Sequence, residues 1–361
     1  MRDLKDIRLD INEIDERMRE LFVLRMNAAR EVAEYKNAHG LPILDSSREK
    51  EIIEKNAGEL EDDELRPYYV SFLQNNMAVS RNYQDMLTSG MKVAYSGVAG
   101  AFAYIAASKL FPNARKIAYP NFESAYNACV DGECETVVLP IENSYNGEVG
   151  AVTDLMFSGP LVVNGIVDID ISHCLLASVN ATMADIKTVI SHPQALAQCR
   201  KYIQAHGFSE KEFENTALAA EYVADTNDKS IAAIASETAA SLFGLKVLEK
   251  NINESRSNTT RFAVFSRSEH KHTPGESGIH SIILFTVKNE AGALAKALDI
   301  IGKHGFNMRT LRSRPMKSLM WEYYFYIEAE GNANSKEGKR MLEDLDEFCD
   351  KLKIVGSYVK Q

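Results

Sequence analysis

Cysteine is scarce in this sequence, and long apolar stretches are missing from it. The five cysteines are Cys129, Cys134, Cys174, Cys199 and Cys349, and no two of them form a Cys-x-x-Cys pair. An odd number without such a pair predicts reduced thiols rather than a disulfide framework or a zinc site. No apolar run approaches the length of a membrane span, and charged residues begin at Arg2. We therefore expect a cytoplasmic protein.

An excess of basic residues is also missing. Lysine and arginine number 41 against 51 aspartates and glutamates, so the net charge is −10. General nucleic-acid binding needs a basic surface, and this balance argues against it, whereas a site for a small anion needs only local cations. With 45% hydrophobic and 25% charged residues the composition is that of a soluble globular protein, and 361 residues predict two or three domains.

A long helix is predicted over residues 4–37, because apolar residues recur there at steps of three and four. These residues are Leu4, Ile7, Ile11, Ile14, Met18, Leu21, Ala28, Val32 and Tyr35. Such a seam packs lengthwise against other helices. Arg25 interrupts it, and a guanidinium buried there without a partner would cost several kcal/mol. Arg25 therefore either has a partner or extends to the edge of the helix.

Two further cations bear on the role of Arg25. Lys36 lies three turns beyond it, about 16 Å along the axis and about 20° around it, so the two side chains can hold a small dianion between them. Arg8 lies about 25 Å away in the other direction, so it joins the same site only from a second, antiparallel chain. The alternative is a solvated charged face on a dimerisation helix.

The N-terminal residues resemble the all-helical chorismate mutase family in its intertwined-dimer form. The matching residues are Arg8, Asp15, Arg25, Lys36, Asp45, Arg48, Glu49, Ser80 and Gln84. We expect further helices near residues 48–57 and 62–87, a domain over residues 1–88 and a short linker after it. The resemblance implies rearrangement of chorismate to prephenate, which needs no acid, base or cofactor. Catalysis then means holding one conformer and stabilising charge on the breaking ether oxygen.

The same resemblance implies a role for each matching residue. Arg25, Lys36 and Arg8 of a second chain would bind the two carboxylates of chorismate. Lys36 and Gln84 would face the ether oxygen and act as the catalytic residues. The remaining residues would take the hydroxyl (Glu49 with the backbone of Asp45) or support these contacts (Arg48 and Ser80).

From residue 91 to 267, short apolar runs alternate with amphipathic stretches. Strands are predicted near residues 92–95, 116–119, 136–140, 161–167, 173–177, 188–190, 230–235 and 262–265, with helices such as 101–110 and 122–130 between them. This alternation predicts two parallel sheets with helices on both faces and a cleft between two lobes. Ligands of such sheets bind in loops beyond the carboxyl ends of the strands.

Three motifs are predicted to lie in such loops. They are Pro-Ile-Glu-Asn-Ser at 140–144, Ser-His-Pro-Gln-Ala-Leu at 191–196 and Asn-Thr-Thr-Arg-Phe at 258–262. Each alone suits an ordinary helix start or strand. Together they resemble the prephenate dehydratase family, which implies a two-lobed α/β domain similar to periplasmic binding proteins over residues 91–267.

This second resemblance implies that prephenate loses its ring carboxylate and its hydroxyl together, without metal or redox cofactor. A hydroxyl side chain held by amide donors near the leaving oxygen suits that reaction. Thr260 takes this catalytic role by resemblance. The substrate site would comprise Asn143, Ser144, Ser191, Gln194, Arg261 and Phe262, with Glu142 and His192 as electrostatic partners. The chain departs from the family at residues 100–103, where Gly-Ala-Phe-Ala replaces the usual Gly-Thr-Phe-Ser and two hydroxyls are lost.

Two other functions remain open for this region. The glycine-containing turn at residues 97–103 suits an NAD-dependent prephenate dehydrogenase. Only two of the three fingerprint glycines are present, however, and the second strand ends in Tyr119-Pro120-Asn121 without the acidic residue that binds the ribose. The other alternative is a regulatory or ligand-binding protein without catalysis.

The last block, residues 279–361, follows a polar linker at 268–278 in which His270 and His272 are expected to face solvent. Its predicted order of strand, helix, strand, strand, helix and strand is that of a ferredoxin-like α+β fold. The block resembles an ACT domain, a sensor of free amino acids, and the resemblance implies phenylalanine as effector. The effector residues would be Gly292, Ala293, Leu294, Arg312, Ser313, Arg314 and Pro315. Arg312 stands where the family has glutamate, and the alternative is a plain dimerisation module.

Overall fold

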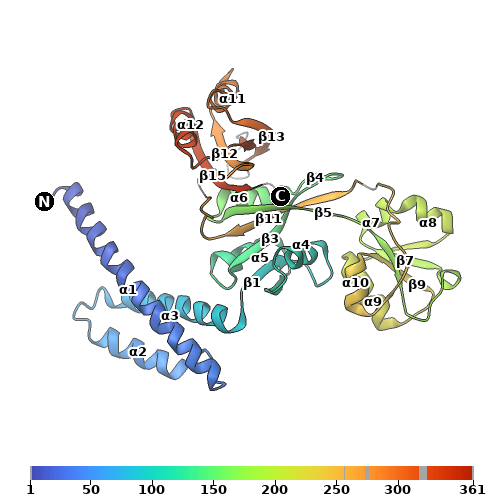
Figure 1. Ribbon diagram of the computed structural model, residues 1–361, viewed down its shortest axis with the longest axis horizontal. Coiled ribbons are helices and arrows are strands. Elements are labelled where there is room, and N and C mark those ends of the chain that lie inside the picture. Colours follow the sequence, from blue (N-terminus) through green and yellow to red (C-terminus); the bar gives the residue numbers. More distant parts are fainter. Residues whose placement is uncertain (1, 256, 273–275, 317–322, 360–361) are drawn as a thin grey trace. The chain divides into compact units, whose positions relative to one another are not determined.

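The computed structural model describes residues 2–255, 257–272, 276–316 and 323–359 (Figure 1). The chain forms two compact units, one ending at Lys92 and the other spanning Val93–Gln361. Within the described residues, no helix combines the length and the apolar character that crossing a membrane requires.

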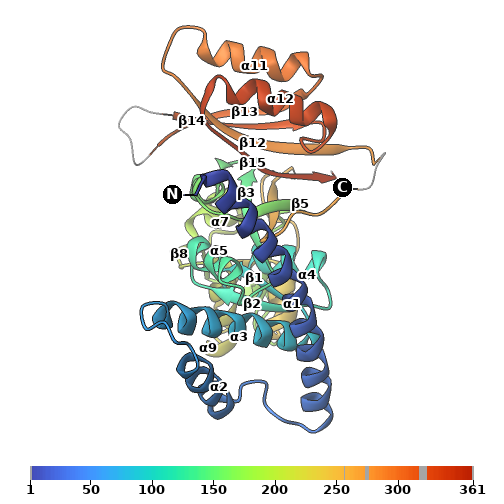
Figure 2. The ribbon, with the colours of Figure 1, turned by 90° about the vertical axis from the view of Figure 1, so that its left-hand side faces the viewer.

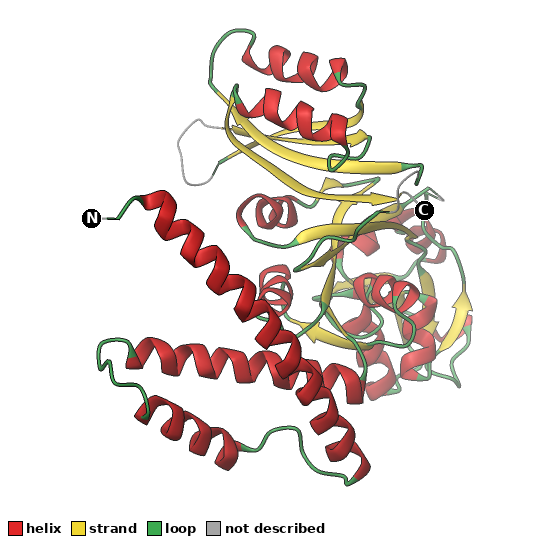
Figure 3. Ribbon diagram, turned by 60° about the vertical axis from the view of Figure 1, so that its left-hand side comes forward, coloured by secondary structure: helices red, strands yellow, loops and turns green. Residues whose placement is uncertain are grey.

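The first unit contains three helices, α1 (Leu4–Ala38), α2 (Ser46–Gly58) and α3 (Arg66–Ser89). The Asp3 and Asp45 carboxylates accept backbone hydrogen bonds at the first turns of α1 and α2, which favours helix initiation at both positions. Helix α3 packs against both of the others (Figure 3). The three predicted helices are confirmed, although α3 begins four residues later than predicted.

The N-terminal part of α1 leaves its apolar seam uncovered within the chain. Only Ala29 and Ala33 of α1 are buried. Six seam residues remain between 38% and 64% exposed, namely Leu4, Ile7, Ile11, Ile14, Met18 and Leu21. A contiguous apolar stripe of this length marks a protein–protein contact surface.

The first sheet of the second unit has the strand order β2-β1-β3-β11-β5, and β4 pairs with β3. The strands are β1 (Lys92–Ser96), β2 (Arg115–Tyr119), β3 (Thr136–Asn143), β4 (Gly147–Glu148), β5 (Val162–Asp170) and β11 (Thr259–Ser266). The sheet is not parallel as predicted, because β11 runs antiparallel to both β3 and β5. The first motif was predicted to lie in a loop, but β3 continues beyond the predicted strand and includes Ile141 to Asn143.

A second lobe contains the sheet β10-β6-β9-β7-β8, which is likewise mixed. Its strands are β6 (Cys174–Ala177), β7 (Thr188–Ser191), β8 (Ser209–Glu212), β9 (Ile231–Ala235) and β10 (Lys246–Glu249). The helices around the two sheets are α4 (Phe102–Leu110), α5 (Phe122–Val130), α6 (Gly150–Ser158), α7 (Pro193–Gln198), α8 (Arg200–His206), α9 (Thr216–Thr226) and α10 (Glu237–Phe243). Two segments join the lobes, one between β5 and β6 and the other between β10 and β11. The two-lobed α/β prediction is confirmed.

The third sheet is antiparallel with the order β13-β14-β12-β15. Its elements are β12 (Ile279–Val287), α11 (Ala293–Lys303), β13 (Asn307–Pro315), β14 (Tyr323–Glu330), α12 (Lys336–Asp346) and β15 (Cys349–Val359). This is the predicted ferredoxin-like order, although Trp321 of one predicted strand lies outside the described residues. The two helices cover one face of the sheet (Figure 2).

The other face of the third sheet shares a core with the first sheet. Along β12, Ile283 and Phe285 pack under the helices, whereas Ile282 and Leu284 join the core that contains Val163 of β5. Strand β15 packs along β5. Gly356 of β15 has a φ of 153°, and a Cβ there would collide with the backbone of Val163, so only glycine permits this approach. The third sheet is therefore built onto the first.

One expectation about the linker is wrong. His270 is exposed as predicted, but the side chain of His272 is only 8% exposed. Its Nε2 lies 2.9 Å from the backbone oxygen of Ser357 in β15, which holds the ring against the third sheet. Linker residues 273–275 lie outside the described residues.

Candidate active sites

A pocket in the first unit collects the charged residues that the sequence singled out. It is lined by Arg25 and Lys36 of α1, by Asp45, Arg48 and Glu49 at the start of α2, and by Ser80 and Gln84 of α3. Seven of the eight residues predicted to bind chorismate therefore lie together. The eighth, Arg8, is exposed and does not line this pocket.

Arg25 has partners across the helix interface. Its Nη1 donates to the backbone oxygen of Asn76 at 3.2 Å and to the hydroxyl of Ser80. Burial lowers the pKa of this guanidinium. Lys36 donates from Nζ to the backbone oxygen of Ile43 at 2.5 Å. Both cations are thus held at the pocket wall by neutral groups, which leaves their charge available to an anion.

Sequence reasoning missed Arg81, which also lines the pocket. Its guanidinium forms an ion pair with Glu49. Its place directly after Ser80 in α3 was the available signal. Gln84 is buried, and its side-chain oxygen has no hydrogen-bond partner among the described residues. An unpaired amide oxygen in a polar pocket indicates a position that a ligand donor completes.

A second pocket lies where the connecting segments pass between the two lobes of the second unit. Its walls include Asn143, Thr260 and Phe262 of the first sheet, and His192, Gln194 and Gln198 at α7 of the second lobe. Ile171, His173 and Asn258 of the connecting segments complete it. Four of the eight residues predicted to bind prephenate, Asn143, His192, Gln194 and Phe262, therefore line this pocket together with Thr260, the predicted catalytic threonine.

Asn143 and Thr260 are joined by a hydrogen bond whose direction is fixed by the backbone. The Asn143 Oδ1 accepts from the N–H groups of Tyr145 and Asn146, each at 3.0 Å, so its amide nitrogen points the other way. That nitrogen donates to the Thr260 hydroxyl oxygen at 2.8 Å and to Asn258 Oδ1 at 2.8 Å. The hydroxyl hydrogen of Thr260 is therefore left to donate elsewhere.

The network continues to two residues that sequence reasoning missed, Gln198 and His173. Asn258 Nδ2 donates to Gln198 Oε1 at 3.0 Å, and His173 Nε2 lies 3.0 Å from the same oxygen. An oxygen only accepts, so Nε2 carries the proton of the ring. Burial lowers the pKa of His173 and keeps the imidazole neutral. The Gln198 amide nitrogen has no partner among the described residues and is free to bind a ligand oxygen.

Four other predicted residues are not in this pocket. Arg261 and Glu142 alternate with Thr260 and Asn143 along their strands and so point to the opposite face of the sheet. Ser144 donates from its hydroxyl to the backbone oxygen of Ser257 at 3.0 Å. Ser191 is fully buried and donates to the backbone oxygen of Ile234 at 2.6 Å. None of these four side chains lines the pocket, since each is turned toward protein, and their contact with substrate stays a prediction.

Among the residues that the structure describes, those lining this pocket include no lysine or arginine. Residues at two helix N-termini line it instead. Ala101, Phe102 and Ala103 stand at the start of α4, and Asn215 and Thr216 stand at the start of α9. Free backbone N–H groups at such ends favour anions. Ala101 and Ala103 are the positions where the family carries hydroxyls, so the backbone remains the donor there.

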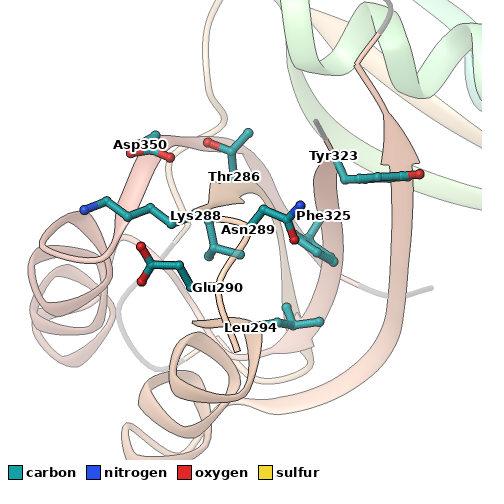
Figure 4. A pocket seen from close by; sticks show the side chains of 9 residues that line it. Thr286, Lys288, Asn289, Glu290, Leu294, Tyr323, Phe325 and Asp350 are labelled. Atoms are coloured by element: carbon teal, nitrogen blue, oxygen red, sulfur yellow. The ribbon is translucent and has the colours of Figure 1, made fainter. Parts of the chain in front are cut away.

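The third sheet carries a separate pocket beside the β12–α11 turn (Figure 4). The pocket is lined by Lys288, Asn289 and Glu290 of the turn, by Tyr323 and Phe325 of β14, and by Thr286, Val287, Leu294 and Asp350. Of the predicted effector residues, Leu294 lines this pocket. Gly292, with a φ of 85°, precedes α11, and Ala293 is its first residue.

The predicted effector motif at residues 312–315 lies elsewhere. Arg312 forms an ion pair with Glu142, and Arg314 donates from Nε to Asp154 of α6 at 3.2 Å. Ser313 and Pro315 are paired in register with Phe325 and Tyr323 of β14. The described part of the chain thus uses Arg312 and Arg314 to contact the first lobe rather than to line the pocket of Figure 4.

Comparison with known proteins bears on both active-site pockets. A family model for chorismate mutase type II matches residues 7–85, and one for prephenate dehydratase matches residues 93–270. A bifunctional chorismate mutase/prephenate dehydratase of Aquifex aeolicus is 32% identical over 100% of this chain and 99% of its own length. The chain belongs to the bifunctional chorismate mutase/prephenate dehydratase family. The corresponding protein of Escherichia coli K12 is 29% identical over 98% of this chain and 95% of its own length.

This membership decides between the alternatives that the sequence left open. The protein rearranges chorismate to prephenate and converts prephenate to phenylpyruvate in phenylalanine biosynthesis, so the dehydrogenase and non-catalytic alternatives are set aside.

Solved structures resemble the second unit. The prephenate dehydratase of Arthrobacter aurescens in complex with L-Phe is 26% identical, with a TM-score of 0.68 over 75% of this chain and 90% of its own. GqqA, described as a novel type of quorum quenching acylase, is 32% identical, with a TM-score of 0.69 over 75% of this chain and 98% of its own.

Replacing Gln198 with leucine tests the free amide in the dehydratase pocket. A hydrogen bond to a charged group contributes about 1.5–3 kcal/mol, so we expect the KM for prephenate to rise roughly tenfold to a hundredfold. Steady-state dehydration of added prephenate measures it, and chorismate mutase activity of the same preparation is the control. An unchanged KM would show that Gln198 does not contact substrate.

Proposed function

We propose that the two activities reside in the two polar pockets described above, one in each compact unit. The mutase site is supported by Arg25, Lys36 and Arg48 lining one pocket with Glu49 and Gln84. In this assignment Arg25 and Lys36 bind the carboxylates of chorismate in its compact conformer. Lys36 and Gln84 then face the ether oxygen, where negative charge grows as the bond breaks. Glu49, which forms an ion pair with Arg81, accepts a hydrogen bond from the ring hydroxyl of chorismate.

The dehydratase site is proposed to be the pocket around Thr260. The main support is the hydrogen bond from the Asn143 amide to the hydroxyl oxygen of Thr260. That bond orients the Thr260 hydroxyl as a donor to the departing oxygen of prephenate. The electron pair of the breaking ring–carboxylate bond moves into the ring and expels the hydroxyl, which leaves as water after taking up one proton. The threonine stabilises the charge on the leaving oxygen.

Substrate anchoring in this pocket is assigned to neutral donors. The free amide of Gln198, the first turns of α4 and α9, and His192 at the start of α7 surround the site. A dianion bound by amide dipoles rather than by a guanidinium keeps the ring carboxylate only moderately stabilised, and this favours its loss as CO₂.

Two substitutions separate the activities. Arg25→Ala removes a carboxylate partner and should lower mutase activity by roughly a hundredfold or more, while dehydration of added prephenate continues. Thr260→Ala should do the reverse by a similar factor. Assays of both reactions on each variant measure this. If both activities fell together in either variant, the assignment of independent sites would be contradicted.

We also propose that the protein is an intertwined homodimer or a higher homo-oligomer. The support is the uncovered apolar seam of α1, which a second copy of the same helix would bury. In an antiparallel arrangement Arg8 of the second protomer completes the chorismate site, since Arg8 does not line the pocket of its own chain.

Subunit mixing tests the shared site. Arg8→Ala and Arg25→Ala are each expected to inactivate the mutase, but a mixed dimer contains one site with both arginines intact. Random mixing makes half of the dimers mixed, so we expect recovery of about a quarter of the unmodified activity. The two variants are co-expressed so that mixed dimers form, and the mutase activity is compared with that of each variant alone. No recovery would show that Arg8 acts within its own chain, and an active Arg8→Ala variant by itself would show that Arg8 has no role in the site.

Residues 279–361 are proposed to form an ACT domain that binds L-phenylalanine at the pocket of Figure 4. Glu290 suits the ammonium of an amino acid, Lys288 suits its carboxylate, and Leu294 with Phe325 suits an aromatic ring. The similar dehydratase of Arthrobacter aurescens was solved with L-Phe bound, which supports this choice of ligand. Domain limits of 1–88, 91–267 and 279–361 fit this division.

Calorimetric titration with L-phenylalanine tests the proposed effector site. Glu290→Gln removes one charge-assisted contact and should weaken binding by about tenfold or more. Asp299→Asn, an exposed acid on helix α11 that follows the turn, is the matched control and should bind as the unmodified protein does. Equal affinity in both variants would place the ligand elsewhere.

A further inference from the structure

The strands β3 and β11 present different side chains on their two faces. In the antiparallel register Thr260 is opposite Asn143, and Arg261 is opposite Glu142. Since successive side chains alternate, Thr260 and Asn143 face the dehydratase pocket, whereas Arg261 and Glu142 face the third sheet. Each residue that faces the pocket is therefore next in the chain to one that faces the third sheet: Thr260 to Arg261, and Asn143 to Glu142.

Arg261 is held by side chains of the third sheet. Its Nη1 and Nη2 lie 2.9 and 3.0 Å from the two carboxylate oxygens of Glu328 in β14, a bidentate pair. The Glu328 side chain is 3% exposed and also accepts from the hydroxyl of Tyr358. Burial alone would raise the pKa of Glu328, but Arg261 and Tyr358 hold it below its usual value, so the pair stays charged.

Glu142 is held by the neighbouring strand β13 at the edge of the third sheet. It forms an ion pair with Arg312 of β13, whose guanidinium lies 5.6 Å from the centre of the Tyr326 ring. Glu142 also lies 3.5 Å from Arg261. Two arginines and two glutamates thus alternate across the junction, mostly shielded from solvent, where ion pairs are least screened, and the exposed Asp168 lies 3.6 Å from Arg261 at its margin.

The backbone of β3 links the orientation of Asn143 to the ion pairs of Glu142. A register shift between Arg261 and Phe262 leaves Ile141 of β3 without a partner in β11. A bulge of this kind interrupts the ladder and re-aims the side chains beside it. Glu142 and Asn143 lie directly after the bulge, where both are paired with β11 and with β4, so a shift of the backbone at Glu142 is passed on to Asn143.

We propose that Arg312 and Glu328 are positioning residues of the dehydratase reaction. By holding Glu142 and Arg261, they set the orientation of Asn143 and Thr260 on the opposite face of the same strands. The inference rests on the proposed roles of Asn143 and Thr260. It gives Arg312, which stands where the family has an acidic residue, a partner of opposite charge in this chain.

Arg312→Gln tests this role. We expect kcat for prephenate to fall at least tenfold while KM changes less than threefold, because orientation is lost and the anchoring groups remain. Arg312→Lys, which keeps the charge, should restore at least a third of kcat. Lys353→Gln is the matched control, since Lys353 of β15 donates to the backbone oxygen of Met156 at 2.6 Å across the same junction, away from the pocket. Its kcat should change less than twofold.

Two further variants keep the test decisive. Glu142→Gln removes the same ion pair from the other side, and combined with Arg312→Gln it should lower kcat no further than either change alone. Chorismate mutase activity in every preparation reports correct folding of the other unit, and melting curves report folding of this one. If folded Arg312→Gln and Glu142→Gln both retained full kcat while Thr260→Ala lost activity, the positioning role would be overturned and the assigned site would stand. Full activity of Thr260→Ala would remove the assigned site as well.

Discussion

The second unit depends on the pairing of β3 with β11. This one antiparallel register places Asn143 against Thr260 in the dehydratase pocket and Glu142 against Arg261 at the junction with the third sheet. Because side chains alternate on a strand, neither face can move without the other. The core shared by the first and third sheets and the close approach of Gly356 to β5 hold this junction together.

In the proposed assignment of the two sites, the two pockets bind similar dianions in different ways. The mutase pocket presents Arg25, Lys36 and Arg48, which suits a reaction in which substrate and product keep both carboxylates. The dehydratase pocket presents amides and helix N-termini, which suits a reaction that must expel one carboxylate as CO₂. The placement of cations therefore follows the chemistry of each step, although the product of the first reaction is the substrate of the second.

The sequence predicted the fold well where periodicity was long, and less well where motifs were short. The heptad-like seam predicted α1, and cations spaced along it predicted the mutase pocket, because a helix fixes the direction of each side chain. Ile141 to Asn143 and Thr259 to Arg261 were predicted as loop residues, yet both segments lie in strands, and the side chains of Glu142 and Arg261 do not line the pocket. Gln198 was missed because only the folded network shows that its amide lacks a partner.

The most direct test of this account is a crystal structure of the protein with a non-reacting analogue of prephenate. We predict that the analogue contacts Thr260, Asn143 and Gln198 and the first turns of α4 and α9, while the bidentate pair of Arg261 with Glu328 stays intact. An Arg261 guanidinium turned away from Glu328 and bound to a carboxylate of the analogue would contradict the two-faced arrangement on which the account depends.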